Sequence, residues 1–191
     1  MGIARNIARL VPNGSGLLPN ANIEAVAASK LTGQVPDANA PSGSVVQTIL
    51  ARSESNNAFS TSSTSLVGVG ALEASITPIS SSNKILVMVC MAVGMDGWSA
   101  GTFKFGLNRN GSTIFGDFRS LENYGADSGN SPYDSNTYGH FMYLDSPSTT
   151  SSTTYAPALG TSNGVAIYLN RYYGQNNQRG ISYMLLQEIA A

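Results

Sequence analysis

The sequence predicts an all-β fold, an antiparallel β-sandwich, preceded by an extended N-terminal segment with a short helix. Three observations predict it. From Ser44 onward, short runs of alternating apolar and polar residues recur between Gly, Pro, Ser and Asn turns, which is typical of antiparallel sheets. The run from Ile85 to Val93 has no polar side chain, as expected of a strand buried on both faces. Helical spacing is rare and occurs before residue 44. About nine strands in two sheets with crossing connections would form a jelly roll.

Charge and composition exclude several classes of partner. Only 11% of the 191 residues are charged and the net charge is -1, so there is no overall positive field to attract nucleic acid or an anionic membrane. The 42% hydrophobic content suffices for a core, yet no apolar run reaches the roughly 20 residues of a membrane-spanning helix. We therefore expect no nucleic-acid binding and no membrane insertion. The N-terminus also lacks the features of a signal peptide, which predicts a chain kept in a cytoplasm until it is assembled.

The first residues predict a short helical anchor. Ile3, Ile7 and Leu10 recur at helical spacing, and Arg5 and Arg9 lie four residues apart on another face. One or two helical turns are too short to be stable alone in water, so they need a surface to dock on. We expect an anchor peptide that attaches the chain to other proteins, and the alternative is a frayed terminus.

Residues 17–43 predict a stalk. The tetrapeptide PNAN at 19–22 returns as PDAN at 36–39, and a short helix is expected between them over 23–31. The segment has too few apolar side chains for a core of its own. Identical copies wound about a symmetry axis could pool those side chains, and a floppy linker is the alternative. The expected organisation is therefore an anchor and stalk over 1–43 and a head domain over 44–191.

Within the head, alternation and turn signals predict the strands one after another. The Asn110-Gly111 pair between two alternating runs is the strongest hairpin signal in the chain. A polar, Gly-rich stretch over 120–135 predicts a long exposed loop, and 174–178 predicts a turn. The expected strands cover residues 45–52, 58–66, 69–76, 84–94, 102–109, 112–118, 138–144, 153–159, 165–172 and 180–189.

The strand over 84–94 is expected to be central and to be covered twice. Both of its parities are apolar: Ile85, Val87, Val89, Met91 and Val93 on one face, Leu86, Met88, Cys90 and Ala92 on the other. A lone sandwich usually leaves one face of each strand wet, so a doubly apolar strand indicates a second buried surface, such as a subunit interface. The same reasoning predicts that Cys90, the only cysteine, is a reduced core thiol.

The motif SSTSLVGVGALEASITPISSSNKILVMVCMAVG, which contains this strand, resembles one in structural proteins of tailed bacteriophages, especially marine ones, at the start of a C-terminal fibre or appendage domain. The upstream ASKLTGQVPDANA, the downstream NRNGSTIFGDFRS and the closing RGISYMLLQEIA fit the same pattern. The resemblance implies a virion protein on a tail, tail fibre or capsid. It also implies the three-fold symmetry of fibres, hence a homotrimer of jelly rolls similar to the tumour-necrosis-factor type of head.

The residues predict no enzyme, no cofactor and no metal. His140 is the only histidine, and no nucleophile elbow or other local motif surrounds it. Zinc sites need several His or Cys ligands, and the chain has one of each. Four carboxylates fall around one loop without the spacing of a calcium loop, and nothing singles out a glycosidase pair. These four are Asp117, Glu122, Asp127 and Asp134.

Tyrosines with amide neighbours are the most suggestive candidates for binding. A rigid ring beside Asn, Gln and Ser suits adaptable recognition of a host surface glycan or protein. The alternative is that these rings cap sheet edges or fill a subunit interface. The receptor-binding candidates are Tyr124, Tyr133, Tyr138, Tyr172, Tyr173 and Asn176.

Three functions follow for testing. The first is a trimeric tail fibre or tail-tip adhesin, anchored through its N-terminus to other virion proteins and exposed on the particle surface. The second is a capsid fibre or decoration protein with the same fold. The third and least favoured is a polysaccharide-degrading tailspike.

Overall fold

A computed structural model describes residues 40–56, 58–95, 102–119, 135–172 and 175–191 of the chain. For 117–119, 135–137, 172 and 175–179 it describes the backbone alone. The predicted anchor helix and the predicted stalk up to residue 39 lie outside the described residues. The expected division into a segment over 1–43 and a head over 44–191 stays a prediction.

The described residues form thirteen strands and one turn of 3-10 helix, η4 (Gly70–Leu72). The long strands coincide with the runs in which apolar and polar residues alternate, because a pleated strand places successive side chains on opposite faces. The strands are β1 (Val45–Ser53), β2 (Ser60–Thr61), β3 (Val67–Gly68), β4 (Ala74–Ile76), β5 (Lys84–Met95), β6 (Phe103–Arg109), β7 (Ser112–Arg119), β8 (Ser135–Asp145), β9 (Thr153–Thr161), β10 (Ile167–Leu169), β11 (Arg171–Tyr172), β12 (Gln175–Arg179) and β13 (Ser182–Ile189).

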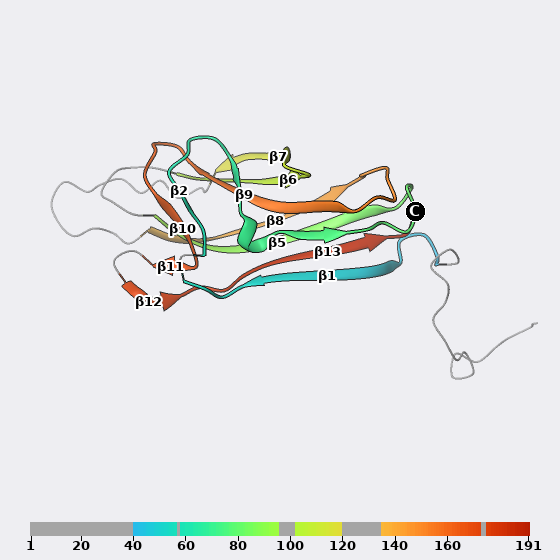
Figure 1. The fold of residues 1–191 in the computed structure, drawn as a ribbon, viewed down its shortest axis with the longest axis horizontal. Coiled ribbons are helices and arrows are strands. Elements are labelled where there is room, and N and C mark those ends of the chain that lie inside the picture. Colours follow the sequence, from blue (N-terminus) through green and yellow to red (C-terminus); the bar gives the residue numbers. More distant parts are fainter. Residues whose placement is uncertain (1–39, 57, 96–101, 120–134, 173–174) are drawn as a thin grey trace, which may run out of the picture. The chain divides into compact units, whose positions relative to one another are not determined.

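The strands pair from the outside of the chain inwards. β1 pairs with β13, β3 and β4 pair with β9, β5 pairs with β8 and β6 pairs with β7, all antiparallel. A larger sheet has the order β1-β13-β5-β10-β2 with β8 also on β5, and a smaller sheet has the order β3-β9-β6-β7 with β4 also on β9. A ribbon of nested antiparallel pairs folded into two sheets is a jelly roll (Figure 1). The predicted all-β antiparallel sandwich is therefore confirmed.

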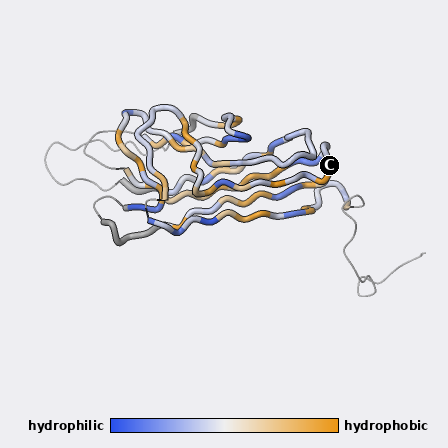
Figure 2. Tube along the Cα trace, in the orientation of Figure 1, coloured by the Kyte–Doolittle hydropathy of each residue, from blue (hydrophilic) through white to orange (hydrophobic). Residues whose placement is uncertain are grey.

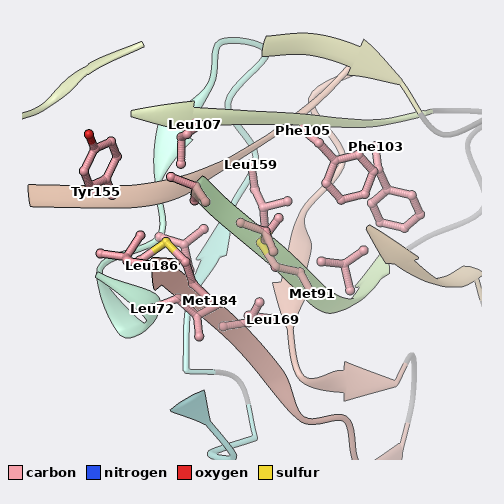
Figure 3. Close-up of a cluster of buried hydrophobic side chains, with 14 of the residues drawn as sticks. Leu72, Met91, Phe103, Phe105, Leu107, Tyr155, Leu159, Leu169, Met184 and Leu186 are labelled. Carbon is pink, nitrogen blue, oxygen red and sulfur yellow. The ribbon is translucent and has the colours of Figure 1, made fainter. Parts of the chain in front are cut away.

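The core fills the space between the two sheets. Figure 3 shows Met91 of β5, Met184 and Leu186 of β13 and Leu159 of β9 converging there, and all four are fully buried. Phe103, Phe105 and Leu107 approach from β6, with ring centroids of the two phenylalanines 6.3 Å apart. Burying one such side chain contributes about 1.5–3 kcal/mol. Hydrophobic residues accordingly recur along the strands of both sheets (Figure 2).

β5 is the central strand of the larger sheet, as predicted. One edge pairs with β8 from Ile85↔Asp145 to Met95↔Ser135, and the other edge pairs first with β13 and then with β10. The parity that starts at Ile85 is buried against the smaller sheet, whereas Leu86, Met88 and Cys90 are only half-buried. The prediction of Cys90 as a core thiol was wrong, because its parity faces away from the core. Its partial burial raises the pKa of the thiol.

The Asn110-Gly111 hairpin is confirmed. Asn110 has a φ of 49° and Gly111 a φ of 80°, and two successive positive φ angles are the signature of a type I′ turn. The turn joins β6 to β7, whose register runs to Arg109↔Ser112. Local turn chemistry therefore sets this pairing.

Four expected elements differ from the structure. Over 58–66 only two residues pair, because serine and threonine hydroxyls there accept hydrogen bonds from nearby backbone N–H groups, such as Ser65 N–H to Ser63 Oγ at 3.0 Å. The strand expected over 69–76 is interrupted by η4, which directs Leu72 into the core. Of the turn expected over 174–178, the described residues 175–178 belong instead to β12, which pairs with β11.

The fourth difference is the break at Asn170, which divides the strand expected over 165–172 into β10 and β11. Asn170 is fully buried at a φ of 58°. Its Nδ2 donates to the Ser53 carbonyl at 2.9 Å, and its Oδ1 accepts from Ser182 Oγ at 2.6 Å. Ser182 Oγ also accepts from the Ala92 N–H at 2.9 Å. These bonds satisfy buried polar groups where β5 changes partner from β13 to β10.

Candidate functional site

The sandwich has two different ends. Gly43 N–H donates to the Ala190 carbonyl at 2.8 Å, and Ala190 N–H donates to the Ser44 carbonyl at 2.9 Å. The chain therefore enters the jelly roll beside the residues where β13 completes it, and we call this the entry end. β5 leaves the entry end and stops at Met95, directly opposite the start of β8 at Ser135. We call that opposite side the far end.

The far end is where the tyrosine-bearing segments attach. Residues 120–134 connect β7 to β8, and both strands meet that connection at the far end, as the pairs Lys104↔Arg119 and Met95↔Ser135 require. Tyr124, Tyr133 and Tyr173 themselves lie outside the described residues. Tyr172 belongs to β11 and Asn176 to β12, for which the backbone alone is described.

Tyr138 is placed differently from the other candidates. It lies on β8 opposite Ala92, with its ring 58% exposed and stacked on His140 at a centroid distance of 5.9 Å. Both rings stand on the side of the larger sheet that faces away from the core. Tyr138 therefore belongs to the strand surface rather than to a loop.

This surface, the outer face, is formed by β1, β13, β5 and β8. Their registers place outward side chains in rows that run across all four strands. The middle row is wholly apolar, and each of the rows beside it has two polar residues among its four. The rows are Leu50, Leu185, Met88 and Met142; Thr48, Gln187, Leu86 and Leu144; and Arg52, Tyr183, Cys90 and His140.

Large apolar side chains on the outer face are exposed to solvent. Met142 is 70%, Leu50 60% and Leu144 51% exposed. A shallow groove lies between Leu50 on β1 and Met142 on β8, and the half-buried Met88 and Leu185 form part of its lining. Exposed apolar side chains gathered in this way are a common feature of interaction surfaces.

The outer face is nearly free of charge. Arg52 stands at its edge, where it pairs with Glu54 at 2.7 Å and lies 5.9 Å from the centre of the Tyr183 ring. None of the other eleven residues in the three rows is an acid, a lysine or an arginine. The surface is therefore suited to apolar contacts and offers no charge for recognising an ionic ligand.

An ionic cluster with a buried carboxylate joins the two sheets at the entry end. Arg109 of β6 donates to both carboxylate oxygens of Asp145 on β8, at 3.0 and 2.8 Å, and Tyr155 of β9 donates its hydroxyl to the same carboxylate at 2.6 Å. Asp145 and Tyr155 are buried. The cluster joins a strand of the larger sheet to two strands of the smaller sheet, and both carboxylate oxygens of Asp145 have partners in it, so it holds the two sheets together.

Alkaline pH is expected to weaken this cluster through Tyr155. Burial, and then the bond to Asp145, raises the pKa of Tyr155 above its ordinary value. The unfolded chain releases this proton near pH 10, whereas the folded chain keeps it, so stability is full below about pH 10 and is lost as pH rises further, by about 1.4 kcal/mol per pH unit. Urea unfolding of the wild type and of Tyr155→Phe should give a stability difference that is constant up to about pH 10 and shrinks above it. A pH-independent difference would contradict this expectation.

The described residues also bear on the catalytic and metal alternatives. Cys90 and His140 are direct cross-strand neighbours, as a thiol nucleophile and its base would have to be. However, the pKa of Cys90 is raised, whereas a nucleophilic thiol needs a lowered one. In the part of the chain that is described, no three His, Cys, Asp or Glu side chains gather as metal ligands. Of the loop carboxylates, Glu122, Asp127 and Asp134 lie outside the described residues, and only the backbone of Asp117 is described.

The described residues include no helix that is long and apolar enough to span a membrane.

Comparisons with known proteins gave two kinds of result. No family model matches the chain, and no curated protein matches it.

Several solved structures are similar to it in part. VP2 of infectious bursal disease virus, as a subviral particle, is 11% identical with a TM-score of 0.39 over 78% of this chain and 38% of its own. The T=1 particles derived from that virus are 12% identical with a TM-score of 0.39, over 84% and 40%. Dimeric latent PorU from Porphyromonas gingivalis is 11% identical with a TM-score of 0.37, over 79% and 14%. This chain therefore spans less than half the length of each.

Sequence reasoning identified a second apolar parity of the central strand, which includes Met88 and Cys90, but missed the residues of other strands that join them into a surface. Leu50, Met142, Leu144 and Leu185 come from three other strands, and each belongs to an ordinary alternating run. Only the registers bring them side by side. The one available signal was that these runs also carry apolar residues on both parities, as β5 does.

Proposed function

We propose that this chain is a structural protein of a tailed-phage virion, and that its jelly roll is the head of a homotrimeric tail fibre or tail-tip adhesin. The observation that carries the proposal is that the two ends of the jelly roll differ. The chain enters and completes the domain at one end, through the bonds between Gly43 and Ala190, and the tyrosine-bearing segment over 120–134 attaches at the other. A head held from behind by a stalk, with its recognition residues at the tip, requires this arrangement.

Two further features support the proposal. The chain resembles tailed-phage appendage proteins over the motif around β5, and its surface chemistry is polar with few charges. The N-terminal residues Ile3, Arg5, Ile7, Arg9 and Leu10 would hold other virion proteins. Tyr124, Tyr133, Tyr172, Tyr173 and Asn176 would face a host glycan or protein, and Tyr138 would join them only if the ligand reaches β8.

The alternative is a capsid fibre or decoration protein. The difference between the two ends favours it equally, because a decoration protein is also held at one end. Its task would be attachment to the shell rather than recognition of a host. Assembly in the host cytoplasm would precede either role.

Both roles are tested by imaging purified virus particles from cells that produce this chain during infection, with an antibody fragment against the chain as a label. Label on the tail, together with blocked virus adsorption when host cells are first incubated with the purified full chain, is expected for the adhesin. Label on the head shell would overturn the adhesin and favour the decoration protein. Particles without label would overturn both proposals.

A further inference from the structure

We propose that the outer face of the larger sheet is the surface through which copies of this chain bind one another. The inference deepens the proposed fibre head, on which its count of three copies rests. It assigns the interface to the three rows of residues on β1, β13, β5 and β8, with the row Leu50, Leu185, Met88 and Met142 at its centre.

The first step is that this face is poorly suited to water. In a sheet that is solvated on one side, outward positions are polar, whereas here the outward positions of four neighbouring strands are apolar in the middle row. The most protruding of them, Met142, is 70% exposed. Leaving such side chains in water forgoes about 25 cal/mol for each Å² of apolar surface that a partner would cover.

The second step is extent. From His140 to Leu144, the three rows extend for about 13 Å along β8 at 3.3 Å per residue, and β1 lies three strand spacings away, about 14 Å. The projected area of the three rows is on the order of 200 Å², and the protruding side chains of Met142, Leu50 and Leu144 add to the surface that a partner can cover.

The third step selects the occupant. Two copies of one surface meet without repulsion only where that surface carries no excess of one charge, because like charges across an interface are costly. The one charged residue in the three rows, Arg52, lies at a corner and already has Glu54 as its partner. The face therefore tolerates its own copy and offers nothing to attract an acidic or basic protein.

The relief of the face fits the same occupant. Leu50 and Met142 stand on either side of the groove, and Met88 and Leu185 lie lower within it. A neighbour related by rotation presents the same ridges, which can fill the same groove. Methionine side chains at two of these four positions adapt readily to such packing.

The test is the mass of the full chain in solution. Sedimentation equilibrium of the wild type should give three chains of 19.9 kDa each. Met142→Arg and Leu50→Arg place a charge at exposed positions of the interface, where an isolated domain tolerates it, and each should reduce the mass to one chain with an unchanged far-UV circular dichroism spectrum. Ile79→Arg is the matched control: Ile79 is 45% exposed but precedes β5 in a loop, so this variant should keep the wild-type mass.

Cys90 provides a second readout, because it is the only thiol and belongs to the face. A maleimide should label it slowly in the wild type and in Ile79→Arg, and faster in the two monomeric variants. A wild type that sediments as one chain would overturn the interface and indicate another occupant, such as a different virion protein. An oligomer that survives both substitutions would also overturn it.

The proposed function can fail separately. A trimer that dissociates in Met142→Arg, but is absent from virus particles, would leave this interface standing and overturn the virion role. Labelled particles together with an oligomer that survives Met142→Arg would support the virion role and overturn this interface.

Discussion

Replacing Asp145 with Ala should lower the free energy of unfolding by about 3 kcal/mol, because it leaves the partly buried Arg109 guanidinium and the buried Tyr155 hydroxyl without their shared acceptor. Asp145 accepts hydrogen bonds from Arg109 on β6 and from Tyr155 on β9. The Arg109 side chain is 32% exposed and water can partly rehydrate it, so the cost should fall toward the lower end of the range for a broken buried pair. Tyr155 is fully buried and has no such relief.

Urea unfolding at one fixed chain concentration measures this effect, since assembly would otherwise add to stability. Glu54→Ala is the matched control, because it also removes a carboxylate from an arginine pair, but from one that is about half exposed. That control should cost less than about 1 kcal/mol. Equal losses in the two variants would show that the Asp145 cluster does not lock the sheets together.

Replacing Gly139 with Ala should destabilise the domain by about 2–3 kcal/mol through overpacking. Gly139 is buried on β8, and a Cβ atom there would lie 2.2 Å from Cε1 and 2.6 Å from Cδ1 of Phe105. Phe105 is itself 2% exposed within the core, so its ring has little room to move. The glycine is thus required for the ring to lie against the backbone of β8.

A double-mutant cycle with Phe105→Leu separates this cause from a general effect of alanine. The smaller leucine should relieve the clash, so the double variant should be more stable than the sum of the single losses predicts. Gly70→Ala is the control, because a Cβ atom at Gly70 meets nothing within 4 Å, and it should change stability by less than about 0.5 kcal/mol. Strictly additive losses would contradict the proposed contact.

The parts of the fold that were predictable from the sequence are those specified locally. The apolar run of β5 identified a central strand because no loop or solvated strand has that composition, and Asn110-Gly111 identified its hairpin because few residues tolerate two positive φ angles. Alternation located β1, β6, β8, β9 and β13 to within a few residues. In each case, neighbours in the sequence carry the physical cause.

What the sequence did not predict depends on residues that are distant along the chain. The break at Asn170 is caused by bonds to Ser53 and Ser182, and no local signal distinguishes this asparagine from one in a turn. The outer face likewise depends on a register that sets Leu50 beside Leu185 and Met88 beside Met142. The burial of Cys90 was misjudged for the same reason, since parity alone does not say which side of a sheet meets the core.

The nesting of the strand pairs has a consequence for biosynthesis. Among the described strands, β1 pairs with β13 alone, and the pair Val45↔Ile189 joins residues from the two extremes of the jelly roll. Pairings at such sequence separation form slowly. β1 must therefore wait until β13 has been translated before the jelly roll can close, and the apolar strands translated in the meantime are exposed to aggregation.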